Sequence, residues 1–120
     1  MGLTVKHLPI DRPPNPGDQS KNARDIVAEG VRRKASADTI AGAVATCIQE
    51  SDLHNNLVQD VYGSAGLFGQ RAIYYGGYAN TINTTLAIKK FYDSYLSYIA
   101  KGKTWYDASD SAQEIGRAHV

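Results

Sequence analysis

The chain has 120 residues, 42% of them hydrophobic, so it is long enough for one compact domain with a core and too short for two ordinary domains. Its formal net charge is only +1, and it has no long run of like charges, which argues against a nucleic-acid or anionic-membrane partner. No apolar stretch approaches the roughly 18 to 20 residues that span a bilayer, and the single cysteine, Cys47, excludes an internal disulfide.

The N-terminal region predicts a lead-in followed by a helix. Residues 1–19 contain all four prolines and are expected to form a flexible lead-in or linker to a domain over residues 20–120. The first helix is expected to start at Ser20 or Asn22 and to end in the basic residues 32–34. Its apolar face consists of residues at helical spacing, namely Ala23, Ile26, Val27, Gly30 and Val31.

A second helix is predicted to follow, with Ser36 as its N-cap and Asp38 in its first turn. One stripe of this helix contains Ile40, Val44, Cys47, Ile48 and Ser51. Small residues fill much of the remaining surface, which suits close packing, so this segment is expected to be the buried central helix. Cys47 is then a small buried hydrophobe, because a catalytic thiol needs a nearby base.

The segment over residues 52–82 reads as an irregular lobe. It is rich in glycine and tyrosine, and its short apolar pieces show no long alternation. Residues 57–61 and 72–75 are the candidate strands, and the lobe is expected to contain a small hairpin. This lobe is expected to form one wall of a cleft.

A third helix is predicted after residue 82, capped by Asn83 or Thr84 and ended by Lys101 and the glycine that follows it. Its apolar face consists of Ile88, Phe91, Tyr92, Tyr95 and Ile99. A last short helix is expected over residues 110–118, and Trp105 is expected to anchor the core.

Glu50 has an unusual position at the end of the second helix. At about 100° per residue it lies on the flank of the buried stripe, neither fully buried nor fully free. A helix C-terminus disfavours a carboxylate, and partial desolvation raises its pKa, so the position suits a general acid near neutral pH. The alternative is an ordinary surface glutamate that points into water.

Two short motifs in this region are similar to those of a known superfamily. The first motif is Glu50 and Ser51 at the end of a predicted helix. The second motif is Gly66, Leu67 and Phe68, which follow after a polar segment. This order and approximate spacing resemble the lysozyme-like lytic transglycosylase superfamily, particularly the cell-wall lysis domains carried by phages and bacteria. The similarity continues through the predicted third helix and covers about residues 22–120.

The resemblance implies a mainly helical, lysozyme-like fold in two lobes, with a glycan cleft between them. It also implies that Glu50 is the catalytic acid, which protonates the leaving oxygen of the β-1,4 bond between N-acetylmuramic acid and N-acetylglucosamine. The expected activity is that of a peptidoglycan lytic transglycosylase or a lysozyme (muramidase), and no cofactor or metal is required.

The chain departs from the family pattern at Gly69, where the family commonly has glutamine. The side-chain contact to the sugar is then absent, or Gln70 makes it instead. The glycines serve a tight turn and also let backbone groups face the substrate. The candidate substrate contacts are Ser51, Gly66, Phe68, Gln70, Tyr75 and Tyr92.

A hydrolytic route needs a second carboxylate across the sugar from Glu50. Asp60 is the better candidate, because Asp52 is too near Glu50 in the sequence, although a turn-forming role for Asp60 stays open. Without a second carboxylate, the acetamido group of the substrate can assist, and a 1,6-anhydro sugar is released. His54 is expected at the surface or cleft rim, since no histidine cluster has metal-ligand spacing.

Two other functions stay open: a peptidoglycan-binding or structural domain that keeps the fold without activity, and an unrelated helical interaction module. The expected partner is the glycan strand of peptidoglycan, with no nucleic acid and no membrane span. The start of the chain lacks the pattern of a signal peptide. The expected location is nevertheless extracellular, in the cell wall or on a virion. The chain can belong to a larger phage-tail or secreted protein.

Overall fold

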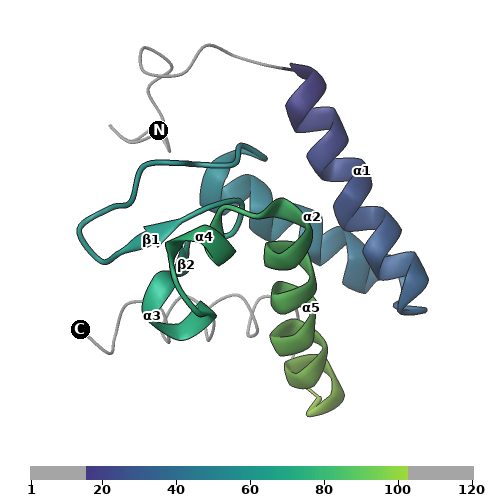
Figure 1. The fold of residues 1–120 in the computed structure, drawn as a ribbon. Coiled ribbons are helices and arrows are strands. Elements are labelled where there is room, and N and C mark those ends of the chain that lie inside the picture. The colour runs from purple at the N-terminus through teal and green to yellow at the C-terminus, as the bar shows by residue number, and fades with distance from the viewer. Residues whose placement is uncertain (1–15, 103–120) are drawn as a thin grey trace.

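A computed structural model describes residues 16–102 of the chain, and within them the fold is mainly helical (Figure 1). The helices are α1 (Pro16–Arg32), α2 (Ala37–Ser51), α3 (Ala72–Tyr75), α4 (Tyr78–Thr81) and α5 (Thr84–Ala100). The strands β1 (Ser64–Ala65) and β2 (Gln70–Arg71) form one antiparallel pair. Figure 1 shows the hairpin, α3 and α4 gathered on the opposite side of α5 from α1.

Helix α1 begins earlier than the sequence predicts. It starts at Pro16 rather than at Ser20 or Asn22, so the last part of the expected lead-in is helical. Proline is tolerated at the first helical position because the first N–H groups of a helix have no partner within it. Asp18 in the first turn is favoured by the positive end of the helix dipole.

The predicted caps of the other two long helices are confirmed. The Ser36 hydroxyl accepts a hydrogen bond from the Thr39 backbone N–H at 3.1 Å, at the start of α2. The Asn83 side chain accepts one from the Leu86 N–H at 3.0 Å, at the start of α5. Helix α2 ends at Asp52, which adopts a left-handed conformation with φ of 55°.

The irregular lobe contains the expected small hairpin, but both predicted strands are wrong. Strand pairing joins Ser64 to Arg71 and Ala65 to Gln70. Residues 57–61 form a loop with exposed apolar side chains, and residues 72–75 form helix α3. Neither segment alternates strongly enough to make one buried face, so local turns decide its conformation.

The core lies where the long helices meet the hairpin turn. Its buried hydrophobic members are Ile26, Ala43, Cys47, Leu67, Phe68, Ile88, Phe91, Tyr92 and Tyr95. Helices α1, α2 and α5 cross closely at Gly30, where an added Cβ would lie 2.5 Å from Ile40 Cγ1. Three residues of the predicted apolar stripes are instead exposed, namely Val27, Val31 and Ile48.

Two predictions fall on residues outside the described range, namely the helix over residues 110–118 and the core role of Trp105. Within residues 16–102, no helix is both long and apolar enough to cross a membrane. The described residues also contain no group of three or more His, Cys, Asp and Glu side chains that could hold a metal ion.

Candidate functional site

Glu50 lies in the last turn of α2, and its side chain faces the turn that joins the two strands. A Cβ added to Gly69 in that turn would lie 3.1 Å from the Oε1 atom of Glu50. Glu50 is half-buried. The helix end and the glycine-rich turn, which are separated in the sequence, therefore meet at this carboxylate.

Ser51 fastens the end of α2 to the same turn. Its hydroxyl donates a hydrogen bond of 2.7 Å to the backbone carbonyl of Leu67, and its exposed fraction is 3%. The Cys47 thiol, one turn earlier on α2, donates to the same carbonyl at 3.3 Å. Burial raises the pKa of Cys47 to about 12, which keeps it a neutral thiol rather than a nucleophile. Ser51 therefore supports the site from behind and does not present its hydroxyl to solvent.

The other side chains of the turn point into the protein. The Phe68 ring stacks on Phe91 with centroids 4.1 Å apart and an interplanar angle of 7°. Gln70 is buried, and its Nε2 atom donates to the Ala87 carbonyl at 3.1 Å. The amide of Gln70 is thus engaged in holding α5, and it does not replace the glutamine that the family has at position 69.

Gly66 has a structural reason for being glycine. Its φ is +84°, and an added Cβ would overlap the backbone carbonyl oxygen of Thr81. Its N–H also donates to the Asn56 carbonyl at 2.7 Å. The close approach of the α4 backbone therefore fixes Gly66, whatever substrate the turn faces.

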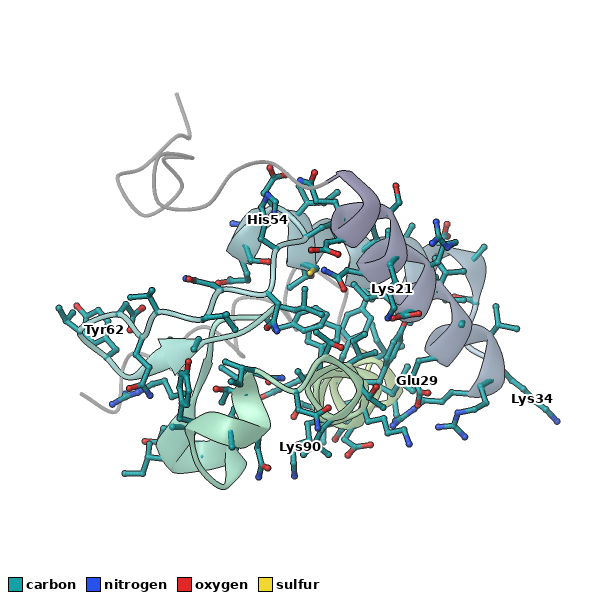
Figure 2. The ribbon with its side chains drawn as sticks, turned by 45° about the horizontal axis from the view of Figure 1, so that its top comes forward. Lys21, Glu29, Lys34, His54, Tyr62 and Lys90 are labelled. Carbon is teal, nitrogen blue, oxygen red and sulfur yellow. The ribbon has the colours of Figure 1, made fainter. Side chains whose placement is uncertain are left out.

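Asp60, the candidate second carboxylate, organises its own loop. Its Oδ1 atom accepts hydrogen bonds from the N–H of Tyr62 at 2.8 Å and of Ser64 at 3.0 Å. The residue is exposed, and Figure 2 shows Tyr62 at the far tip of this loop. The turn-forming role that the sequence left open for Asp60 is therefore present.

The two tyrosines predicted to contact substrate differ in their surroundings. Tyr92 is fully buried, and its hydroxyl donates to the Ile26 carbonyl at 2.8 Å, so it packs in the core away from solvent. Tyr75, on α3, is half-buried. Burial raises the pKa of its hydroxyl, and this effect outweighs the hydrogen bond with the Ser94 side chain on α5, which lowers the pKa. Tyr75 is the better placed of the two to reach solvent.

Polar side chains of α1 hold the segment that leaves Glu50, a feature that the sequence reading missed. Gln19 Nε2 donates to the Asp52 carbonyl at 2.9 Å, and Asn22 Nδ2 donates to the Leu53 carbonyl at 2.8 Å. Asn22 could have indicated this contact in the sequence, because it is a polar residue on the apolar face of α1, four positions before Ile26. His54 follows this segment and is half-buried. Figure 2 labels it on the side of the molecule where α1 begins.

Comparisons with known proteins add no relative. No protein-family model, no curated protein and no solved structure matches this chain.

Chemically, the site offers one half-buried carboxylate that lies beside Gly69 in the turn between the strands. A carboxylic acid in such a place can deliver a proton to an oxygen atom bound nearby. The described residues show no metal-binding cluster near it.

Proposed function

We propose that this chain cleaves the glycan strands of peptidoglycan at the β-1,4 bond between N-acetylmuramic acid and N-acetylglucosamine, with Glu50 as the acid. The observation that carries the proposal is the approach of Glu50 to Gly69, where a Cβ would lie 3.1 Å from the carboxylate. The two motifs that resemble the lysozyme-like superfamily thus lie against each other, joined by the hydrogen bond from Ser51 to the Leu67 carbonyl. A mainly helical fold with a small hairpin lobe is compatible with that resemblance.

In the proposed reaction, protonated Glu50 donates its proton to the glycosidic oxygen as the bond to the anomeric carbon breaks. Positive charge develops on the sugar ring, which takes on oxocarbenium character. The ionised carboxylate that remains can then accept a proton from the group that attacks the anomeric carbon. One carboxylate therefore suffices if the substrate supplies the rest.

The hydrogen bonds of the two candidate aspartates favour this one-carboxylate route, because each aspartate is engaged with other parts of the chain. Asp60 accepts two hydrogen bonds from the backbone of its own loop, and Asp52 Oδ2 accepts one from Gln19 at 3.4 Å. The acetamido group of the sugar would then assist, and attack by the sugar's own 6-hydroxyl would give a 1,6-anhydro product. We therefore propose lytic transglycosylase chemistry ahead of muramidase chemistry.

The test is lysis of purified cell walls, followed as loss of turbidity, with native chain and the Glu50→Gln variant. Glutamine keeps the shape of the side chain and cannot donate a carboxylic proton, so lysis should fall by at least about 100-fold. Equal lysis by both chains would remove Glu50 from the reaction.

The mass of the released fragments decides the second step. Anhydro products are lighter by one water than hydrolytic ones, and we expect the lighter set. Asp60→Asn keeps the Oδ1 acceptor of the loop and removes the charge, so it should lyse walls at the native rate. Full-mass products together with an inactive Asp60→Asn would instead establish a two-carboxylate muramidase.

A second candidate is a peptidoglycan-binding domain without activity. The glycine at position 69 and the buried amide of Gln70 favour it, because neither residue supplies the side-chain amide that the resemblance places beside the acid, so the chain can keep the fold without cleaving the glycan. Co-sedimentation with cell walls that the native chain does not lyse would support this candidate. Either function implies contact with the wall, so we propose an extracellular, wall-associated or virion-associated location.

A further inference from the structure

The hairpin and the loop just before it, residues 63–71, contain three glycines with positive φ whose surroundings differ. At Gly63, with φ of +76°, an added Cβ would meet no atom within 4 Å. At Gly66 it would overlap a backbone carbonyl. At Gly69, with φ of +58°, it would have one neighbour within 4 Å among the described residues, Oε1 of Glu50. A left-handed conformation explains a glycine at each position, but only Gly69 adds a contact with the candidate acid.

The side chains of the turn and of the first residue after it are buried. Leu67 is fully buried and Phe68 is 7% exposed, and the Gln70 amide is bonded to α5. The turn itself is fixed to α2, because Ser51 donates to the Leu67 carbonyl at 2.7 Å. The Glu50 carboxylate therefore approaches Gly69 in a turn that is fixed to the end of α2.

We propose that Gly69 is a positioning residue for Glu50, an inference that rests on the function proposed above. Without a Cβ at position 69, the Glu50 carboxylate can lie against the backbone of the turn. A methyl group 3.1 Å from Oε1 is closer than carbon and oxygen normally approach, so Glu50 must shift by a few tenths of an ångström. Proton transfer depends steeply on such placement, because the reacting atoms must be aligned at about 3 Å.

The matched test compares Gly69→Ala with Gly63→Ala. Both substitutions place alanine at a positive φ in the same lobe, so both carry similar backbone strain, and only the first adds a contact with Glu50. We expect Gly69→Ala to lower the turnover of wall lysis at least about tenfold, with wall binding within about twofold of native. Gly63→Ala should retain native turnover. Equal turnover in the two variants would overturn the proposal, as would a loss of wall binding that matches the loss of turnover.

A second measurement does not depend on lysis. The urea midpoint is measured for Gly69→Ala and Gly63→Ala, each in the native background and in a Glu50→Ala background. If the added methyl meets Glu50, the shift caused by Gly69→Ala should differ between the two backgrounds, whereas the shift caused by Gly63→Ala should be the same in both.

The two measurements separate the proposals. If the native chain does not lyse walls, the proposed enzyme function fails, and the urea comparison alone then judges the contact. Additive shifts for Gly69→Ala would in that case end the positioning role. If the native chain lyses walls and Glu50→Gln does not, but Gly69→Ala behaves like Gly63→Ala, the function stands and the role of Gly69 is lost.

Discussion

The hydroxyl of Ser51 donates a hydrogen bond of 2.7 Å to the backbone carbonyl of Leu67, and this contact joins the end of α2 to the hairpin turn. It is buried, and the Cys47 thiol approaches the same carbonyl from one helical turn away. The serine that follows the candidate acid thus holds the surface that the acid faces. The placement of Glu50 depends on a contact made by its neighbour.

Replacing Ser51 by alanine should destabilise the protein by about 1 to 3 kcal/mol, because a buried carbonyl loses its stronger donor. The Cys47 thiol is a weak donor and should recover only part of this loss. Urea unfolding measures the change. Ser97→Ala on the exposed face of α5 is the control and should stay within about 0.5 kcal/mol of native. Equal effects of the two substitutions would contradict the role assigned to Ser51.

Gly66→Ala should be among the most damaging single substitutions in the lobe. Its Cβ would overlap the Thr81 carbonyl oxygen, so the α4 backbone must move, at a cost of at least about 3 kcal/mol. Gly63→Ala has open space around its Cβ and should cost only the left-handed strain, about 1 to 2 kcal/mol. The difference in free energy of unfolding between the two variants is the measurement. Similar values would mean that α4 does not hold this close approach.

Tyr92→Phe should destabilise the core by about 0.5 to 1.5 kcal/mol, because it removes the hydrogen bond from the tyrosine hydroxyl to the Ile26 carbonyl. Burial raises the pKa of Tyr92 to about 12, so the hydroxyl remains a donor throughout the ordinary pH range. Tyr62→Phe, at an exposed site, should change stability by less than about 0.5 kcal/mol. If Tyr92→Phe retains full stability and instead weakens wall binding, the core role is wrong.

Glu29 should make stability depend on pH in the acid range. The hydrogen bond from Arg32, then that from Arg33, hold the pKa of Glu29 down to about 2 against the opposing effect of burial. Its stabilisation is therefore complete above the unfolded-state value of 4.5 and is lost as the pH falls towards about 2. Glu29 belongs to the last turn of α1, where Figure 2 labels it.

The measurement for Glu29 is the difference in free energy of unfolding between the native chain and Glu29→Gln. We expect it to be on the order of 1 to 3 kcal/mol at pH 7 and to shrink steadily below pH 4.5. High salt should reduce it at pH 7, because Arg32 is largely exposed. A difference that grows on acidification would have the wrong sign and would reject this account.

The site was only partly visible in the sequence. The end of α2 and the glycine-rich turn were recognised as two motifs, and the structure brings them together at Glu50 and Gly69. Two of the side chains predicted to touch substrate, Phe68 and Tyr92, instead lie in the core. An aromatic residue on an apolar stripe gives the same pattern whether it fills a core or lines a cleft, so spacing alone could not separate these roles.

The sequence by itself determined the long helices and where two of them begin. Ser36 and Asn83 act on N–H groups three residues away, so these caps depend only on local geometry and are readable without the rest of the fold. The same holds for the absence of a long, regular strand in the glycine-rich lobe.

The tertiary structure alone decided what faces Glu50. Whether Gln70 reaches outward or bonds the Ala87 carbonyl depends on where α5 packs against the turn, and no local pattern encodes that distance. The same is true of Gly69, whose positive φ suits glycine anywhere but whose contact with the carboxylate exists only once Ser51 holds the turn to α2. Contacts between segments distant in the sequence arise from packing the whole core, and that packing sets the candidate acid against bare backbone.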